Sequence, residues 1–188
     1  MKPVAILLNG KARSGKDTFA NMAKDEIELG NTKFDSSVAT LAYAAPLKDV
    51  CRRNHHYEDK NLDRDVLISI GDDMRDIDQD IFARPITELA NVYAQMGYEI
   101  IIITDLRFKN EYEYTMNNFI GDTYVLKIRS EFESNGVSEF AKNHLGENLD
   151  LEPDQTVAMP TITNENYKSV KNFVKDVIDS VYSDISAT

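Results

Sequence analysis

The chain has 188 residues and a mass of 21.3 kDa, which is enough for one ordinary domain but too little for two independent hydrophobic cores. Hydrophobic residues make up 42% and charged residues 28%, a balance that excludes global disorder. The formal net charge is -11, which argues against polymeric DNA or RNA as a partner, because such partners need a wide basic surface.

Two features bear on where the protein works. The longest purely apolar run, Ile100 to Ile103, is far shorter than the roughly 20 residues of a membrane helix, and Met1 to Gly10 lacks the apolar region of a signal peptide. The single cysteine, Cys51, cannot form an internal disulfide, which fits a reducing compartment. We therefore expect a soluble, cytoplasmic protein with no membrane partner. Cys51 could act as a nucleophile beside His55 and His56, but adjacent polar histidines are more typical of a solvated loop.

Apolar runs and helical periodicity alternate along the chain, which predicts an α/β fold with a parallel sheet of about five strands. The expected strands are Val4 to Leu8, Val38 to Tyr43, Glu99 to Asp105, Thr123 to Ile128 and Gln155 to Ala158. Six helices are expected. The first starts at Asp17 and ends near Gly30, and the second runs from Pro46 toward Arg53. The others cover Leu62 to Arg75, Ile81 to Met96, Asn110 to Asn118, and about 18 residues that include Val170 and Val181. The polar stretch Glu131 to Pro153 is expected to be a mobile lid.

The segment from Gly10 to Thr18 matches the pattern G-x-x-x-x-G-K and lies between a predicted strand and a predicted helix. Its glycines let backbone N–H groups turn inward around an anion, and the following helix directs its positive end at phosphate. Lys16 would add a positive charge at the β- and γ-phosphates of ATP. The alternative interpretation is that this segment is an ordinary strand-to-helix turn in which the lysine has no function. The expected ATP-binding residues are Gly10, Arg13, Ser14, Gly15, Lys16, Asp17 and Thr18.

Three residues are candidate magnesium ligands. Asp17 stands where Ser or Thr usually ligates the ion, and Thr18 follows one residue later. Asp105 ends the isoleucine-rich strand, where a carboxylate can orient magnesium or serve catalysis. Asp105 could instead simply cap its strand.

A phosphotransferase must also bind a second anion in line with the γ-phosphate, so basic residues should gather at the carboxyl ends of the strands. Lys48, Arg75, Arg107 and Arg129 each lie at the boundary of a predicted element, whereas Arg52, Arg53 and Arg64 are better explained as surface charges. The guanine-reading motif N-K-x-D and the protein-kinase motifs H-R-D and D-F-G are absent from the sequence. These observations favour a small-molecule kinase that closes a lid over its substrates.

At these residues the chain resembles the deoxynucleoside monophosphate kinases of bacteriophages. The resemblance is carried by Ser14 to Thr18 (S-G-K-D-T), Tyr43 to Asp49 (Y-A-A-P-L-K-D), Ile70 to Arg75 (I-G-D-D-M-R), Thr104 to Glu111 (T-D-L-R-F-K-N-E), and the spacing of His144 and Glu147. The chain departs from the family after the last predicted strand, where it has Ala158 to Thr161 in place of an Asn-Gly-type turn. Animal phosphomevalonate kinases share the G-K-D loop and the D-x-R strand end, and are the alternative enzyme.

The resemblance implies a single P-loop kinase domain over residues 1–188, with three layers, an acceptor-binding helical region at about 44–96 and a lid at about 130–153. It implies ATP and Mg²⁺ as phosphoryl donor, and a deoxynucleoside monophosphate such as dGMP, dTMP or a modified dCMP as acceptor. Lys16 would hold the donor phosphates, Lys48, Arg75 and Arg107 would bind the acceptor side, and Lys16, Asp105, Arg107 and Arg129 would be catalytic. A phage origin would put the protein in the host cytoplasm. A homodimer is left open, as is a nucleotide-binding regulator that has lost turnover.

Overall fold

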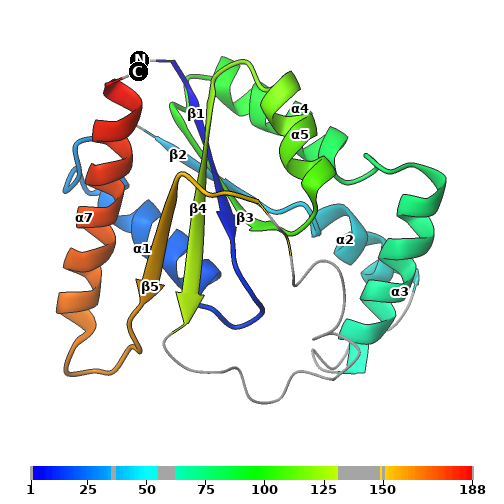
Figure 1. The fold of residues 1–188 in the computed structure, drawn as a ribbon, viewed down its shortest axis with the longest axis horizontal. Coiled ribbons are helices and arrows are strands. Elements are labelled where there is room, and N and C mark those ends of the chain that lie inside the picture. Colours follow the sequence, from blue (N-terminus) through cyan, green and yellow to red (C-terminus); the bar gives the residue numbers. More distant parts are fainter. Residues whose placement is uncertain (1, 35–36, 55–61, 131–148, 150, 188) are drawn as a thin grey trace.

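The computed structural model describes residues 2–34, 37–54, 62–130, 149 and 151–187. In this part of the chain, five parallel strands form one sheet in the order β2-β3-β1-β4-β5 (Figure 1). The strands are β1 (Val4–Asn9), β2 (Val38–Leu41), β3 (Ile100–Leu106), β4 (Asp122–Ser130) and β5 (Gln155–Met159). The helices are α1 (Lys16–Glu28), α2 (Ala45–Asn54), α3 (Leu62–Ile77), α4 (Ala83–Gln95), α5 (Lys109–Asn118) and α7 (Tyr167–Ser186). The expected α/β class with a five-stranded parallel sheet is confirmed.

The central strand β1 is buried along its whole length. It pairs with β3 on one side and β4 on the other, so that Val4 lies opposite both Ile100 and Asp122. Helices cover both faces of the sheet, with α1 and α7 on one side and α4 and α5 on the other (Figure 1). This burial on two faces explains why the sequence of β1 shows no polar alternation.

Successive residues of the central strands contribute to two different cores. Ile6 and Ile102 pack with α1 and α7, whereas Leu7 and Ile103 pack with α4 and α5. A third, smaller cluster joins α2 and α3 through Leu47, Cys51 and Phe82, with Leu67, Ile70, Met74 and Ile81 packed against it. Cys51 is only 3% exposed, so its thiol contributes to this packing. His55 and His56 lie outside the described residues.

The observed boundaries differ from the predicted ones at two informative places. Strand β2 ends at Leu41, two residues early, because the backbone N–H groups of Tyr43 and Ala44 donate to a side chain instead of a neighbouring strand. Strand β4 extends to Ser130 because β5 continues alongside it to Met159. The expected lid falls mainly on residues 131–148 and 150, outside the described residues, so its closure stays a prediction. No helix in the described ranges has the length and apolar character needed to cross a bilayer.

Candidate active site at the carboxyl ends of the strands

The loop between β1 and α1 follows a path that glycine makes accessible. Gly10 has φ +149° and Gly15 has φ +92°, both in the region that disfavours other residues. A Cβ atom on Gly10 would lie 2.2 Å from the backbone oxygen of Ile128, and one on Gly15 would lie 3.1 Å from Cγ of Met159. The loop therefore runs closely over the ends of β4 and β5, where a side chain at residue 10 has no room.

Lys16 begins α1 and turns its side chain back into this loop. Its residue surface is 7% exposed, and its Nζ atom donates to the backbone oxygens of Gly10, at 2.6 Å, and Lys11, at 2.7 Å. Gly15 caps α1 without a side-chain hydrogen bond to the first turn, which leaves that end of the helix suited to an anion. The ammonium group is thus held where a phosphate in the loop would meet it.

The candidate magnesium ligands of this loop, Asp17 and Thr18, lie exposed in the first turn of α1. Arg13 is also exposed, and has φ +60°. Among the described residues no group of three or more His, Cys, Asp or Glu side chains could hold a metal ion. Two exposed oxygen ligands still fit a magnesium ion, since Mg²⁺ keeps several waters and is usually bound through one or two protein groups together with substrate phosphates.

Asn9 connects the loop to the neighbouring strand. Its Nδ2 atom donates to the backbone oxygen of Leu106 at 3.0 Å, in a buried position. Leu106 lies between Asp105 and Arg107, so this bond ties the start of the phosphate loop to the strand end that carries both candidate residues. No function is predicted for Asn9 from the sequence. Its signal is a polar residue that closes a fully buried strand.

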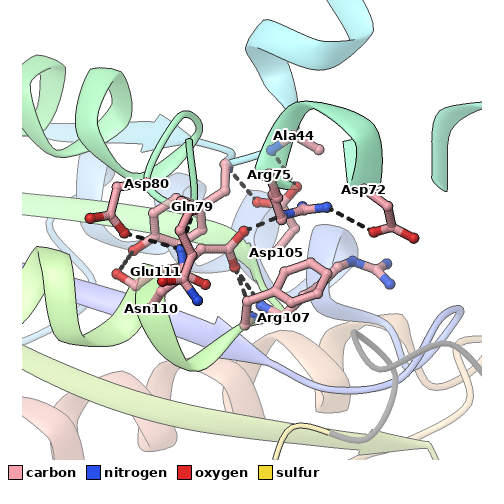
Figure 2. Close-up of polar contacts among 11 residues, drawn as sticks. Ala44, Asp72, Arg75, Gln79, Asp80, Asp105, Arg107, Asn110 and Glu111 are labelled. Atoms are coloured by element: carbon pink, nitrogen blue, oxygen red, sulfur yellow. Dashed lines mark hydrogen bonds and ion pairs between the residues drawn. The ribbon is translucent and has the colours of Figure 1, made fainter. Parts of the chain in front are cut away.

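The Asp105 carboxylate holds the turn between β2 and α2. Its Oδ1 atom accepts the N–H of Tyr43 at 2.6 Å, and its Oδ2 atom accepts the N–H of Ala44 at 3.1 Å (Figure 2). Lys48, half-buried, follows one turn later in α2 and donates its backbone N–H to Ala44. Asp105, on β3, thus caps the carboxyl end of the neighbouring strand β2. Since a carboxylate has lone pairs beyond these two bonds, its part in binding magnesium stays a prediction.

Arg75 is held on several sides near the end of α3. Its guanidinium carbon lies 3.8 Å from the ring centroid of Phe108 and 4.8 Å from that of Phe82. Its Nη1 atom lies 3.4 Å from Asp72, and its Nη2 atom lies 3.8 Å from Oε1 of Glu111 (Figure 2). Burial lowers the pKa of Arg75 and the nearby Arg107 charge lowers it further, whereas the three carboxylates around it, Glu111, Asp72 and Asp105, raise it. The charge of this arginine is fixed in one place before any ligand binds.

Gly71 provides the space for this side chain. A Cβ atom at Gly71 would lie 3.1 Å from Nη1 of Arg75 and 3.1 Å from Cδ2 of Leu47. The glycine therefore lets Arg75 fold back over the preceding turn of α3 while α2 packs closely beside it.

Glu111 is the most deeply buried acidic residue of this region, at 2% exposure. Its Oε2 atom accepts the backbone N–H groups of Arg107, at 2.9 Å, and Phe108, at 3.0 Å, while Oε1 faces Arg75. Burial raises the pKa of Glu111 to about 7, and Asp105 contributes to the rise, against the opposing effects of the two backbone N–H groups and Arg75. From the sequence, Glu111 is only the last residue of the segment Thr104 to Glu111 that carries the family resemblance. Its position three residues after the helix cap, where acidic residues bind free N–H groups, is the signal for its role.

We expect Glu111 to make stability depend on pH. Because burial raises its pKa from 4.5 to about 7, the folded protein binds this proton more tightly than the unfolded chain does. The stability that the folded protein gains by binding this proton more tightly is fully present below pH 4.5 and is lost as pH rises through about 7. Urea unfolding between pH 5 and pH 8 should show wild type losing stability relative to Glu111→Gln, which cannot ionise. An equal pH dependence of the two proteins would contradict the assignment.

Most of the residues predicted from sequence gather at one edge of the sheet. Asp105, Arg107 and Arg75 lie together on the β3 side, and α2 brings Lys48 to the same side. Arg129 lies at the end of β4, exposed, opposite Ala158 of β5 and directly after the residue that Gly10 contacts. The phosphate loop lies between these two groups, because β1 lies between β3 and β4. His144 and Glu147 lie outside the described residues.

The sheet order, the glycine loop over β1 and the buried lysine at the start of α1 define a P-loop kinase. The sequence model of the family described as phosphomevalonate kinase matches residues 8–120, which is more than half of the chain. The chain therefore belongs to that family of P-loop kinases. No curated protein matches the chain by sequence.

Solved structures share the fold at low sequence identity. The APS kinase CysC of Mycobacterium tuberculosis, in complex with AMPPNP and APS, aligns with a TM-score of 0.54 and 14% identity over 96% of this chain and 98% of that chain. An unliganded sugar kinase from Janibacter sp. HTCC2649 aligns with a TM-score of 0.51 and 13% identity over the same shares of the two chains. Both similarities concern the fold alone.

Proposed function

We propose that the protein is a deoxynucleoside monophosphate kinase, which transfers the γ-phosphate of ATP to a deoxynucleoside monophosphate and releases ADP and a deoxynucleoside diphosphate. The observation that supports it best is the set of contacts joining the segments that resemble phage enzymes. Asp105 bonds Tyr43 and Ala44, Glu111 faces Arg75, and Asn9 links the phosphate loop to Leu106. Segments far apart in sequence thus meet at one edge of the sheet.

The proposed donor side is the phosphate loop. Its backbone N–H groups and the Lys16 ammonium would bind the β- and γ-phosphates of ATP, with the positive end of α1 adding to the attraction. The ammonium group already lies inside the loop, within 2.7 Å of two carbonyl oxygens, so little side-chain rearrangement is needed when phosphate replaces them.

The proposed acceptor side is formed by Arg75 and Arg107, with Lys48 on α2. An arginine already fixed by Phe108 and two carboxylates loses little conformational freedom when it binds a phosphate with two hydrogen bonds. The acceptor phosphate oxygen would form a bond to the γ-phosphorus while the bond to the β–γ bridging oxygen breaks, and ADP leaves with that electron pair. Arg107 and Arg129, from opposite sides of the loop, would stabilise the charge on the transferred group.

Magnesium fits the exposed oxygen ligands at the start of α1. When bound, the ion supplies charge neutralisation across the β- and γ-phosphates. Asp17 and Thr18 would hold the ion there, directly or through its waters, and Asp105 would accept a hydrogen bond from a water of the hydrated ion.

Phosphomevalonate is the second candidate acceptor, because the family match carries that description. It shares a phosphate monoester with the nucleotide acceptors, so the same arginines would serve either substrate. The two proposals therefore agree on the reaction and differ in the molecule attached to the accepting phosphate.

The test is a coupled assay of ADP release with ATP and Mg²⁺, run across all deoxy- and ribonucleoside monophosphates and phosphomevalonate. Turnover of at least one deoxynucleoside monophosphate is expected. Turnover of phosphomevalonate alone would replace the first proposal by the second. Binding of ATP without turnover of any acceptor would instead identify a nucleotide-binding regulator.

Replacing Arg75 should affect one substrate more than the other. Arg75→Met is expected to raise the KM of the acceptor about tenfold or more, because a charge-assisted hydrogen bond to phosphate is lost, while the KM of ATP changes little. Steady-state kinetics with each substrate varied in turn measure both values. Arg84→Met is the matched control, since Arg84 is exposed and pairs with Asp78 at 3.0 Å. Equal changes in the two KM values would contradict an acceptor role for Arg75.

A further inference from the structure

The Glu111 carboxylate divides its two oxygens between two elements of the candidate site. Oε2 accepts the N–H groups of Arg107 and Phe108, in the turn between β3 and α5, and Oε1 faces the guanidinium of Arg75 on α3. Phe108 closes the arrangement, because its ring covers the same guanidinium at 3.8 Å. One buried side chain therefore touches both places from which an acceptor-side arginine projects.

We propose that Glu111 is a positioning residue that fixes Arg75 and the Arg107 turn relative to each other, so that both guanidinium groups are set for the acceptor phosphate. This inference rests on the proposed function in taking Arg75 as an acceptor-side group. Glu111 itself does not need to touch either substrate.

Above its pKa of about 7, Glu111 carries a negative charge that acts on the two neighbouring arginines. Arg75 and Arg107 lie close enough for the charge of one to disfavour the other, and a buried carboxylate beside them offsets that repulsion. Asp72 also pairs with Arg75, but its side chain is 44% exposed, against 3% for Glu111, so solvent screens it more strongly. The Asp105 oxygens face the N–H groups of Tyr43 and Ala44, and this carboxylate raises the pKa of Arg75 less than Glu111 and Asp72 do. Glu111 is thus the carboxylate best placed to hold Arg75.

The surroundings keep Glu111 itself from moving. Its backbone oxygen accepts a hydrogen bond from the Tyr43 hydroxyl at 3.4 Å, and that hydroxyl also bonds Thr115 at 2.7 Å. Thr115 in turn bonds Thr87 of α4 at 2.9 Å. Asn110, the preceding residue, donates to the backbone oxygen of Gln79 at 2.6 Å (Figure 2). Helix α5 is therefore fastened to three other parts of the chain, at Tyr43, Thr87 and Gln79.

The test compares Glu111→Gln, Arg75→Met and the double variant in steady-state kinetics, with an acceptor that the ADP-release assay identifies. Glutamine keeps an oxygen for the Arg107 and Phe108 N–H groups but removes the charge that faces Arg75. Glu113→Gln is the matched control, because Glu113 is exposed on the same helix and pairs at the surface with Lys109, at 3.1 Å.

We expect Glu111→Gln to raise the KM of the acceptor about fivefold, with the KM of ATP unchanged within about twofold. The effect should vanish in the Arg75→Met background, since Glu111 then has no guanidinium to position. A purely structural contribution would instead appear equally in both backgrounds and in both KM values, and that result would overturn the proposal.

A second measurement needs no turnover. Urea unfolding of wild type, Glu111→Gln, Arg75→Met and the double variant gives the coupling free energy between Glu111 and Arg75, which is expected to be favourable. Additive losses of stability would overturn the proposal even if Glu111→Gln folds poorly. If no acceptor in the panel is phosphorylated, the proposed function fails, and this unfolding cycle decides the inference about Glu111 independently.

Discussion

Lys16→Ala should lower kcat by at least about a hundredfold while the protein stays folded. The ammonium group lies inside the phosphate loop, within 2.7 Å of the carbonyl oxygens of Gly10 and Lys11, and the variant removes the positive charge that would face the developing charge on the γ-phosphate. Circular dichroism and thermal unfolding establish the fold, and the ADP-release assay measures kcat.

Lys11→Ala serves as the control for that experiment. Lys11 belongs to the same loop, but its side chain is exposed and only its backbone oxygen contacts Lys16, so the variant keeps that contact. Near-wild-type turnover is expected for it. Normal turnover in Lys16→Ala would mean that the loop does not bind the phosphoryl donor.

Gly10→Ala should abolish ATP binding and lower the free energy of unfolding by about 2 kcal/mol or more. The added Cβ atom would lie 2.2 Å from the backbone oxygen of Ile128, and the backbone has φ +149°, so either the loop or β4 must move. Calorimetric titration with a non-hydrolysable ATP analogue and urea unfolding measure the two effects.

Gly30→Ala separates backbone strain from collision. Gly30 also has a positive φ, of +69°, but nothing lies within 4 Å of an added Cβ atom. The expected cost is about 1 kcal/mol, with ATP binding intact. Gly10→Ala behaving like Gly30→Ala in both measurements would contradict the close approach of the loop to β4.

The sheet could be predicted from sequence because its strands are buried on two faces. The run Ile100 to Ile103 and the run Val4 to Leu8 have no polar alternation, which is the pattern of a central parallel strand, and both form the middle of the sheet. The predicted end of β2, at Tyr43, was wrong by two residues. Tyr43 is as apolar as a strand residue should be, and nothing local shows that its N–H donates to Asp105, 62 residues away.

The candidate site also has one part that could be predicted from the sequence and one part that could not. The phosphate loop is one continuous segment with a known spacing, so its residues could be predicted together. The surroundings of Arg75 are assembled from α3, the start of α4 and the turn before α5, and the contacts of Phe82, Phe108 and Glu111 with the guanidinium depend on how those helices pack. Sequence spacing carries no information about these contacts, so Arg75 was predicted and these three partners were not.

The small cluster of Leu47, Cys51 and Phe82 separates the packing of α2 and α3 from that of the sheet. The phosphate loop is anchored on β1, between the two large cores, whereas α2 and α3 pack on their own cluster. Substitutions in this cluster would therefore change the proposed acceptor side without disturbing the strand that carries the phosphate loop. Under the proposed function, a change of acceptor would leave the packing around the proposed ATP site unaltered.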